Sequence, residues 1–187
     1  MKYENEIFKI LCTLSLVTIL SIFFINKCNA QTWTANDMNG VSYDMANFNN
    51  KATLVDISAH WCGPCWSWHT GGVMEELYHD FGPDGTDEFM VFFIDGDAAS
   101  SVSLLNGASG SVGNWVTGTP YPLIGPNGEG ASVASNYTFP GYPTLFLHCG
   151  TGIAPEIQRN EKWIFWNDVL NCSQAFQWQN PDATLLL

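Results

Sequence analysis

The chain has 187 residues, 46% of them hydrophobic and eight of them tryptophan, and its formal net charge at pH 7 is −12. This length fits one domain preceded by a short targeting segment, and the apolar content is ample for a packed core. A surface this acidic repels phosphate backbones and anionic lipid, so we expect no nucleic-acid partner.

Residues 1–30 have the pattern of an export signal. A weakly basic start is followed by an uncharged stretch, 10–25, rich in Leu, Ile, Val and Phe. Cys28 and Ala30 then present the small residues that signal peptidase accepts. We expect cleavage after Ala30 and export to the periplasm or the extracellular space, and an uncleaved N-terminal anchor is the alternative.

The first elements of the mature domain follow in short order. Residues 32–43 are expected to form a β-hairpin, because an Asn-Gly pair supplies its turn. A strand is predicted over 52–58. Apolar residues at helical spacing predict a helix over 65–81, with a kink at Gly71 and Gly72.

Strands and helices continue to alternate in the second half of the chain, which indicates a layered α/β domain. The predicted elements are a strand over 89–94, a helix over 98–106, a Gly- and Ser-rich loop or insertion over 107–118, strands over 121–124 and 144–148, and a final helix over 161–172. The domain is expected to cover 31–172, followed by a C-terminal extension over 173–187.

Cys62 and Cys65 are separated by two residues at the point where a predicted strand gives way to a helix. N–H groups and the dipole at a helix start stabilise negative charge and lower the pKa of the first thiol. Cys62 is therefore expected to be an exposed attacking thiolate, and Cys65 to resolve the mixed disulfide. The alternatives are an inert disulfide or a zinc half-site, and zinc is disfavoured because the chain has no second CxxC.

The segment 53–65 closely resembles the active-site strand and motif of the thioredoxin superfamily. It ends in the sequence Trp61, Cys62, Gly63, Pro64, Cys65. The segment 142–144, Tyr-Pro-Thr, resembles the cis-proline loop of that superfamily, and the N-terminal hairpin with an insertion before Pro143 resembles its exported TlpA/ResA branch. The resemblance implies a thioredoxin-like fold, with a central mixed sheet flanked by helices, and thiol–disulfide oxidoreductase activity.

The resemblance also implies roles for individual residues. Asp56 matches a buried carboxylate that moves a proton to or from Cys65, and burial would raise its pKa. Pro143 would be cis, and Tyr142 would offer its backbone to an extended substrate peptide. The substrate-contacting residues are then Trp61, Gly63, Pro64, Tyr142 and Pro143. The alternatives are an Asp56 that only caps a turn and an ordinary trans Pro143.

Two histidines depart from the most familiar thioredoxin pattern. His60 precedes the cysteine pair, and His69 lies four residues after Cys65 on the same predicted helix. A protonated histidine near the pair would stabilise the thiolate and make the disulfide more oxidising. Packed or solvated histidines without a redox role are the alternative, as is a copper or zinc site that both histidines would form with both cysteines. We expect no metal and no cofactor apart from the redox-active disulfide.

Cys149 and Cys172 are the other cysteines of the mature chain. An even number of cysteines in an oxidising compartment allows a second disulfide, and these two could form it as a structural crosslink. Two buried free thiols are the alternative.

The sequence as a whole predicts an exported, monomeric thiol–disulfide oxidoreductase that acts on protein thiols and disulfides. Resemblance to the TlpA/ResA branch suggests reduction, which in an oxidising compartment would need a membrane electron-donor protein. The rival interpretations are an exported binding domain with a static disulfide, and a metallochaperone.

Overall fold

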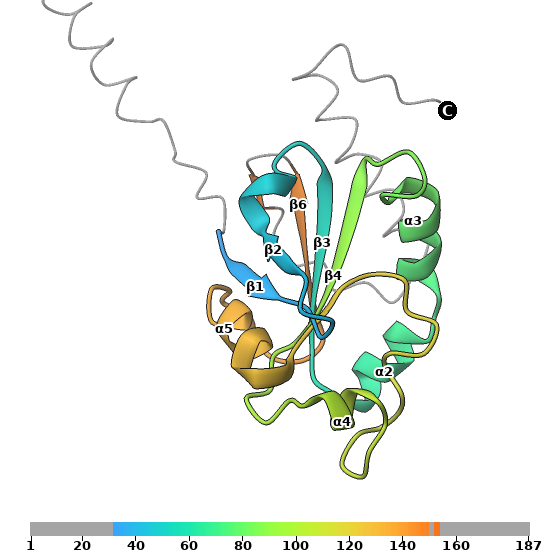
Figure 1. Ribbon diagram of the computed structural model, residues 1–187, viewed down its shortest axis with the longest axis vertical. Coiled ribbons are helices and arrows are strands. Elements are labelled where there is room, and N and C mark those ends of the chain that lie inside the picture. The colour runs from blue at the N-terminus through green and yellow to red at the C-terminus, as the bar shows by residue number, and fades with distance from the viewer. Residues whose placement is uncertain (1–31, 150–151, 154–187) are drawn as a thin grey trace, which may run out of the picture.

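A computed structural model describes residues 32–149 and 152–153 (Figure 1). Its centre is a mixed sheet with the strand order β5-β4-β3-β6-β7. The bounds are β3 Ala52–Ser58, β4 Phe89–Asp95, β5 Leu123–Ile124, β6 Thr144–Cys149 and β7 Gly152–Ile153. β3 runs parallel to β4 and antiparallel to β6. The predicted α/β fold with a central mixed sheet is confirmed.

The two middle strands are buried along their whole length, β3 and β4 alike. An unbroken apolar run such as 89–94 is typical of a strand covered on both faces. β3 differs because it carries three buried polar residues, Thr53, Asp56 and Ser58. Burying a polar side chain costs folding free energy unless the side chain is hydrogen-bonded. The polar residues of β3 are therefore candidates for a functional role.

The N-terminal hairpin is present as predicted. β1 (Thr34–Asn36) pairs antiparallel with β2 (Ser42–Asp44), and a short 3-10 helix, η1 (Met45–Phe48), follows. Gly40 takes a φ of 83° in the connecting turn, a conformation that favours glycine. Trp33 and Ala35 pack with Val55 and Ile57 of β3, so the hairpin covers one face of the sheet.

The predicted helix over 65–81 is two helices, α2 (Gly63–His69) and α3 (Val73–Phe81). Gly72 has a φ of 76°, which an α-helix cannot contain, so the chain breaks there and does not merely kink. The prediction of one helix was therefore wrong. α3 buries Val73, Met74 and Leu77 against the sheet, as its apolar spacing indicated.

Differences from the predicted elements are larger after β4. α4 is only Val102–Leu105, because Ser101 caps it by accepting the Leu104 N–H. A 3-10 helix, η2 (Pro126–Gly128), and α5 (Glu129–Ala134) were not predicted, and neither was β7. The segment 107–118 is a loop, as predicted. The expected signal over 1–30, the helix over 161–172 and the extension over 173–187 lie outside the described residues.

The elements form three layers, with the sheet in the middle (Figure 1). α2, α3 and α4 cover one face together with the loop that carries Trp115, while α5 and the hairpin cover the other. The carboxyl ends of β3 and β4 lie beside each other, because Ser58 is in register with Asp95. In the described ranges, no helix is both long and apolar enough to cross a bilayer.

Candidate active site

Cys62 and Cys65 form a disulfide at the carboxyl end of β3. Cys62 is the N-cap of α2, and the Cys65 N–H donates to its Sγ at 3.2 Å. This bond favours negative charge on the Cys62 sulfur, as expected for the first cysteine of the pair. Cys62 is 4% exposed and Cys65 is 0% exposed. Cys62 is thus the outer residue of the pair, but the expectation that it is exposed was wrong, because it packs into the core cluster together with Cys65.

Asp56 lies on β3, two residues along from Leu54, which packs in the core cluster that contains both cysteines. Its Oδ1 accepts the Ser58 hydroxyl at 2.7 Å, and its Oδ2 has no hydrogen-bond partner among the described residues. Burial raises the pKa of Asp56 to about 7; the Ser58 bond opposes this shift, and the Glu75 carboxylate adds to it. A carboxyl group that titrates near neutrality can both accept and donate a proton.

The peptide bond between Tyr142 and Pro143 is cis, as the resemblance implied. The Tyr142 ring packs edge-to-face on Trp61 with centroids 5.9 Å apart, which places this loop beside the cysteine motif. A Cβ at Gly96 would lie 2.9 Å from the Tyr142 hydroxyl, so the loop after β4 approaches this ring closely. Trp61 is 49% exposed, whereas Trp66 is half-buried in the core, so Trp61 is the tryptophan available for contact.

Gly63 and Pro64 form the first turn of α2 and are exposed. Tyr142 and Pro143 are half-buried, and Tyr142 contacts Trp61, the residue before Cys62. The structure therefore brings the predicted substrate-contacting residues to the motif and its surroundings, and their contact with a substrate stays a prediction.

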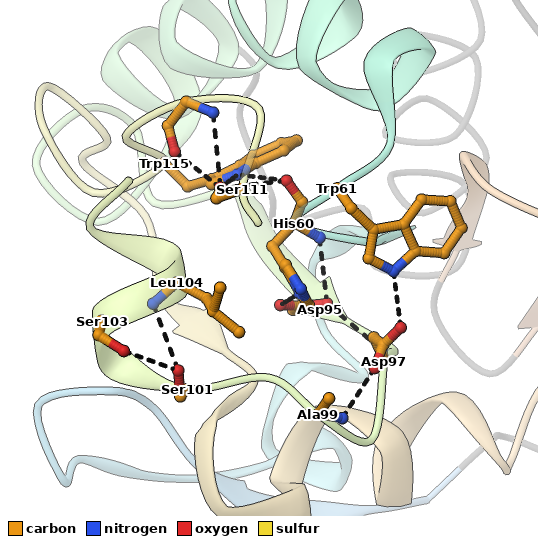
Figure 2. Close-up of polar contacts among 11 residues, drawn as sticks. His60, Trp61, Asp95, Asp97, Ala99, Ser101, Ser103, Leu104, Ser111 and Trp115 are labelled. Carbon is orange, nitrogen blue, oxygen red and sulfur yellow. Dashed lines mark hydrogen bonds and ion pairs between the residues drawn. The ribbon is translucent and has the colours of Figure 1, made fainter. Parts of the chain in front are cut away.

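His60 is buried and paired. Its Nδ1–H donates to Asp95 Oδ2 at 2.9 Å, and Asp95 is itself fully buried at the end of β4 (Figure 2). The His60 N–H also points to Asp95 Oδ1, at 3.3 Å. This double contact ties the segment before Cys62 to the neighbouring strand.

The His60 carbonyl oxygen accepts three hydrogen bonds from one loop. The donors are the Val112 N–H at 3.0 Å, the Ser111 hydroxyl at 3.1 Å and the Trp115 indole N–H at 3.2 Å. Trp115 is fully buried and packs on Trp66 of α2 with ring centroids 5.0 Å apart. The predicted loop over 107–118 is therefore a structural wall of the site that fixes the backbone two residues before Cys62.

His69 also lies in the core, within a chain of polar contacts. Its Nδ1 is 3.2 Å from the Tyr121 hydroxyl, and its Nε2 is 3.2 Å from the Thr119 hydroxyl. Burial lowers the pKa of His69 to about 4, so at neutral pH the ring carries no positive charge. The charge expected to stabilise a thiolate is therefore not supplied by His69, and a tuning role of either histidine stays a prediction.

Glu75 on α3 completes this chain. The Tyr121 hydroxyl donates to its Oε1 at 3.1 Å, and its Oε2 is buried with no hydrogen-bond partner among the described residues. Burial raises the pKa of Glu75, and burial also raises the pKa of Tyr121, which the negative charges of Glu75 and Asp56 raise further. The inner side of the site thus holds two carboxyl groups that interact electrostatically.

On the outer side of the disulfide, beside the exposed Trp61, the pKa of Asp97 is shifted in the opposite direction from that of Glu75. The Trp61 indole N–H donates to its Oδ2 at 2.6 Å and the Ala99 N–H to its Oδ1 at 2.7 Å (Figure 2). The Trp61 bond, followed by the Ala99 bond, lowers the pKa of Asp97 below its ordinary value. This carboxylate is ionised at neutral pH and is fixed beside the exposed tryptophan.

The residues of the alternative metal site are engaged in other contacts, and Cys62 and Cys65 are bonded to each other. The His60 and His69 rings are bound to Asp95 and to Tyr121 and Thr119, respectively. In the part of the chain that the structure describes, no group of three or more His, Cys, Asp or Glu side chains is arranged to hold a metal ion.

Cys149 ends β6, in register with Ala52 at the start of β3, and it takes part in a disulfide. Its position is at the far end of β3 from Cys62. Cys172 lies outside the described residues, so the pairing of Cys149 with Cys172 stays a prediction.

Sequence reasoning missed several residues that shape the site. Asp95 and Asp97 could have been found, because they follow a buried strand that runs parallel to β3 and ends at the same edge. Trp115 and Tyr121 gave no such signal, because each reaches α2 or the segment before it from more than 50 residues away in the chain.

No protein-family model matches the sequence, and no curated protein matches it. Several solved structures are similar to the chain. A thiol:disulfide interchange protein of the thioredoxin family from Chlorobium tepidum is 19% identical with a TM-score of 0.55, over 79% of this chain and 97% of that chain.

Two further structures come from other bacteria. A secreted disulfide oxidoreductase of Mycobacterium tuberculosis, homologous to E. coli DsbE, is 11% identical with a TM-score of 0.58, over 76% of this chain and 97% of its own. An exposed lipoprotein thioredoxin of Streptococcus pneumoniae is 16% identical with a TM-score of 0.51, over 75% of this chain and 98% of its own. The protein therefore has a thioredoxin-like fold, with a CxxC disulfide at the start of α2.

Proposed function

We propose that the protein is an exported thiol–disulfide oxidoreductase that exchanges the Cys62–Cys65 pair with protein substrates. The observation that carries this proposal is the disulfide at the start of α2, where the Cys65 N–H contacts the Cys62 sulfur. The buried carboxyl group of Asp56, with a pKa of about 7, supports it. A structural crosslink requires neither feature.

In the reducing direction, the Cys62 thiolate attacks one sulfur of a substrate disulfide. The substrate S–S bond breaks, one substrate thiolate leaves, and a mixed disulfide with Cys62 remains. Asp56 accepts the proton of the Cys65 thiol, and the Cys65 sulfur then attacks Cys62 and releases the second substrate thiolate. Two electrons pass to the substrate, its two thiolates take up protons, and the Cys62–Cys65 disulfide forms. Oxidation of a substrate dithiol is the reverse.

The substrate is expected to bind as an extended peptide across the exposed residues around the motif. Trp61, Gly63 and Pro64 present accessible surface on one side, and the cis Tyr142–Pro143 loop lies beside Trp61. The Tyr142 backbone would pair with the peptide, as in strand addition.

Export is supported by the pattern of residues 1–30, and by the fact that two proteins of similar structure are a secreted disulfide oxidoreductase and an exposed lipoprotein thioredoxin. Resemblance to the TlpA/ResA branch favours reduction as the direction. A reductant in an oxidising compartment must be recharged, so the proposal includes a membrane electron-donor protein as partner, with the oxidoreductase itself a monomer.

The rival is an exported binding domain whose disulfide is static, and the low exposure of Cys62 is the observation that favours it. An insulin-reduction assay with dithiothreitol separates the two. The oxidoreductase proposal predicts turnover by the full chain and none by Cys62→Ser. Equal background rates for both proteins would contradict it.

A further inference from the structure

We propose that Trp61 and Asp97 form a subsite for a cationic side chain, so that the substrates are disulfide proteins with Arg or Lys close to the reacting cysteine. This inference rests on the proposed function and specifies the substrate class of the same site. It follows from three features of the outer side of the disulfide: an open aromatic face, a fixed carboxylate and the absence of a nearby Lys or Arg in the described residues.

The aromatic face belongs to Trp61, the residue directly before Cys62. Large apolar side chains that are exposed are few among the described residues, and Trp61 is one of them. Tyr142 contacts the indole by an edge-to-face packing at 5.9 Å, and the indole N–H is held by Asp97. The ring is therefore fixed in orientation while nearly half of the residue stays open to solvent.

The carboxylate of Asp97 is held in place by two donors, the Trp61 indole N–H and the Ala99 N–H. An ionised carboxylate has about four acceptor positions, so these two bonds leave room for a ligand's N–H groups. The same two bonds lower the pKa of Asp97, which keeps the group charged at neutral pH. A charge that is already positioned loses little entropy when a partner binds.

No Lys or Arg of the described chain neutralises Asp97. Lys51 is the only Lys or Arg in 32–149 and 152–153, and it is paired with Asp87. Lys51 precedes the first residue of β3, whereas Cys62 follows the last, so the two lie toward opposite ends of the sheet. His60 also lowers the pKa of Asp97, as the smallest of the causes, but its ring is bonded to Asp95.

An Arg side chain fits these features best. Its planar guanidinium can stack on the face of an indole and offer two N–H groups to a carboxylate, whereas Lys offers a point charge. The surrounding surface strengthens the preference, since the chain carries a formal charge of −12. The electric field of this negative charge attracts cationic substrates to the protein and repels anionic ones.

The test uses three peptides that differ only beside one cysteine, which is flanked by Arg, Gln or Glu and blocked as a mixed disulfide with thionitrobenzoate. Release of the coloured thiol by an excess of the reduced full chain, which is itself oxidised to the disulfide, gives a single-turnover second-order rate constant for each peptide. We expect the Arg peptide to react about tenfold faster than the Glu peptide at low ionic strength, with the ratio falling as salt is added.

Asp97→Asn should lower the Arg-to-Gln rate ratio about threefold, toward 1, which is within the size of an exposed ion pair combined with a cation–π contact. Asp84→Asn is the matched control, because it removes the same charge from an exposed position before β4, away from the disulfide. Its Arg-to-Gln ratio should match that of the wild type. Trp61→Leu, which removes the aromatic face, should lower the ratio as Asp97→Asn does.

A second measurement does not depend on redox chemistry. Peptides with Ser in place of Cys are titrated into the oxidised full chain while the Trp61 indole N–H is followed by NMR, and the Arg peptide should shift this signal more than the Glu peptide. Equal rates for the three peptides, or equal effects of Asp97→Asn and Asp84→Asn, would overturn the subsite. An Arg-dependent shift without any thiol exchange would support the subsite and contradict the oxidoreductase proposal, and neither signal would overturn both.

Discussion

The two sides of the Cys62–Cys65 disulfide treat ionisable groups in opposite ways. On the inner side, burial holds Asp56 and Glu75 toward their protonated forms and keeps His69 neutral. On the outer side, hydrogen bonds to Asp97 keep that carboxylate charged. The inner side is therefore suited to moving protons, and the outer side to presenting a fixed charge.

The difference has a simple physical origin. Inside the protein there is little water to solvate a charge, and the groups around Asp56 supply one hydrogen bond, from Ser58. Outside, Asp97 receives two donors and remains in contact with solvent. Residue type alone does not determine what a carboxylate does at this site; its burial and the number of hydrogen-bond donors around it do.

The largest expected effect is on turnover, at the inner cysteine. Cys65→Ser leaves Cys62 able to attack a substrate but removes the sulfur that resolves the mixed disulfide. We expect turnover in the insulin assay to fall at least about 100-fold and a covalent complex with substrate to accumulate. Non-reducing gels check this, and a variant that turns over without trapping substrate would contradict the assigned order of attack.

Asp56→Asn should slow exchange at neutral pH about 100-fold, the typical contribution of a general acid–base group. It should also change stability in a pH-dependent way. The folded-state pKa is raised from 3.8 to about 7, so the folded wild type loses stability as pH rises through this window.

Above pH 7 the Asn variant should consequently be more stable than the wild type, by up to about 4 kcal/mol, and near pH 4 this advantage should vanish. Urea unfolding of the oxidised proteins at pH 5 and pH 8 measures the difference. A constant difference in unfolding free energy at both pH values would argue against a buried, titrating Asp56.

Replacing Trp by Phe at a buried and at an exposed position compares how much each indole N–H contributes to the free energy of unfolding. Trp115→Phe removes an indole N–H that donates to the His60 carbonyl and to Ser111, inside a fully packed loop. We expect a loss of about 1–3 kcal/mol of unfolding free energy. Trp61→Phe breaks an exposed bond and should cost less than about 1 kcal/mol. Chemical denaturation checks both, and equal losses would remove the distinction between the two sides.

Glu75→Gln tests whether the two buried carboxyl groups of the inner side interact. The Glu75 charge raises the pKa of Asp56, so its removal should move the midpoint of the pH–rate profile to lower pH. The neighbouring Glu76→Gln is the matched control, because Glu76 is exposed and does not act on Asp56. Identical profiles for the two variants would show that Glu75 is not coupled to the site.

The smallest effect is expected at the opposite end of the sheet. Lys51→Met removes an ion pair with Asp87, whose side chain is largely exposed. Pairs of this kind contribute about 1 kcal/mol or less, and the loss should not alter exchange kinetics. A change in kcat/KM would indicate a coupling between the two ends that the structure does not suggest.

The features predicted well from sequence are those that short stretches encode. β4 was predicted from an unbroken apolar run, β3 as the strand that leads into the cysteine motif, and the disulfide from two cysteines at a strand-to-helix junction. The cis bond before Pro143 followed from a local motif in the same way.

The features missed depend on conformation or on distant partners. The left-handed Gly72 divides one apolar helical pattern into two helices, and α5 is six residues long with too little periodicity to detect. The wall formed by Trp115 depends on packing against Trp66 and His69, which spacing along the chain does not reveal.

The central claim is that the Cys62–Cys65 disulfide is redox-active. Equilibration of the full chain in glutathione or dithiothreitol buffers, with the fraction of reduced pair read by thiol alkylation, tests it most directly. We predict reversible two-electron reduction with a potential between about −270 and −120 mV, the range of thioredoxin-like exchange proteins. A potential below about −300 mV, typical of structural disulfides, would contradict the claim.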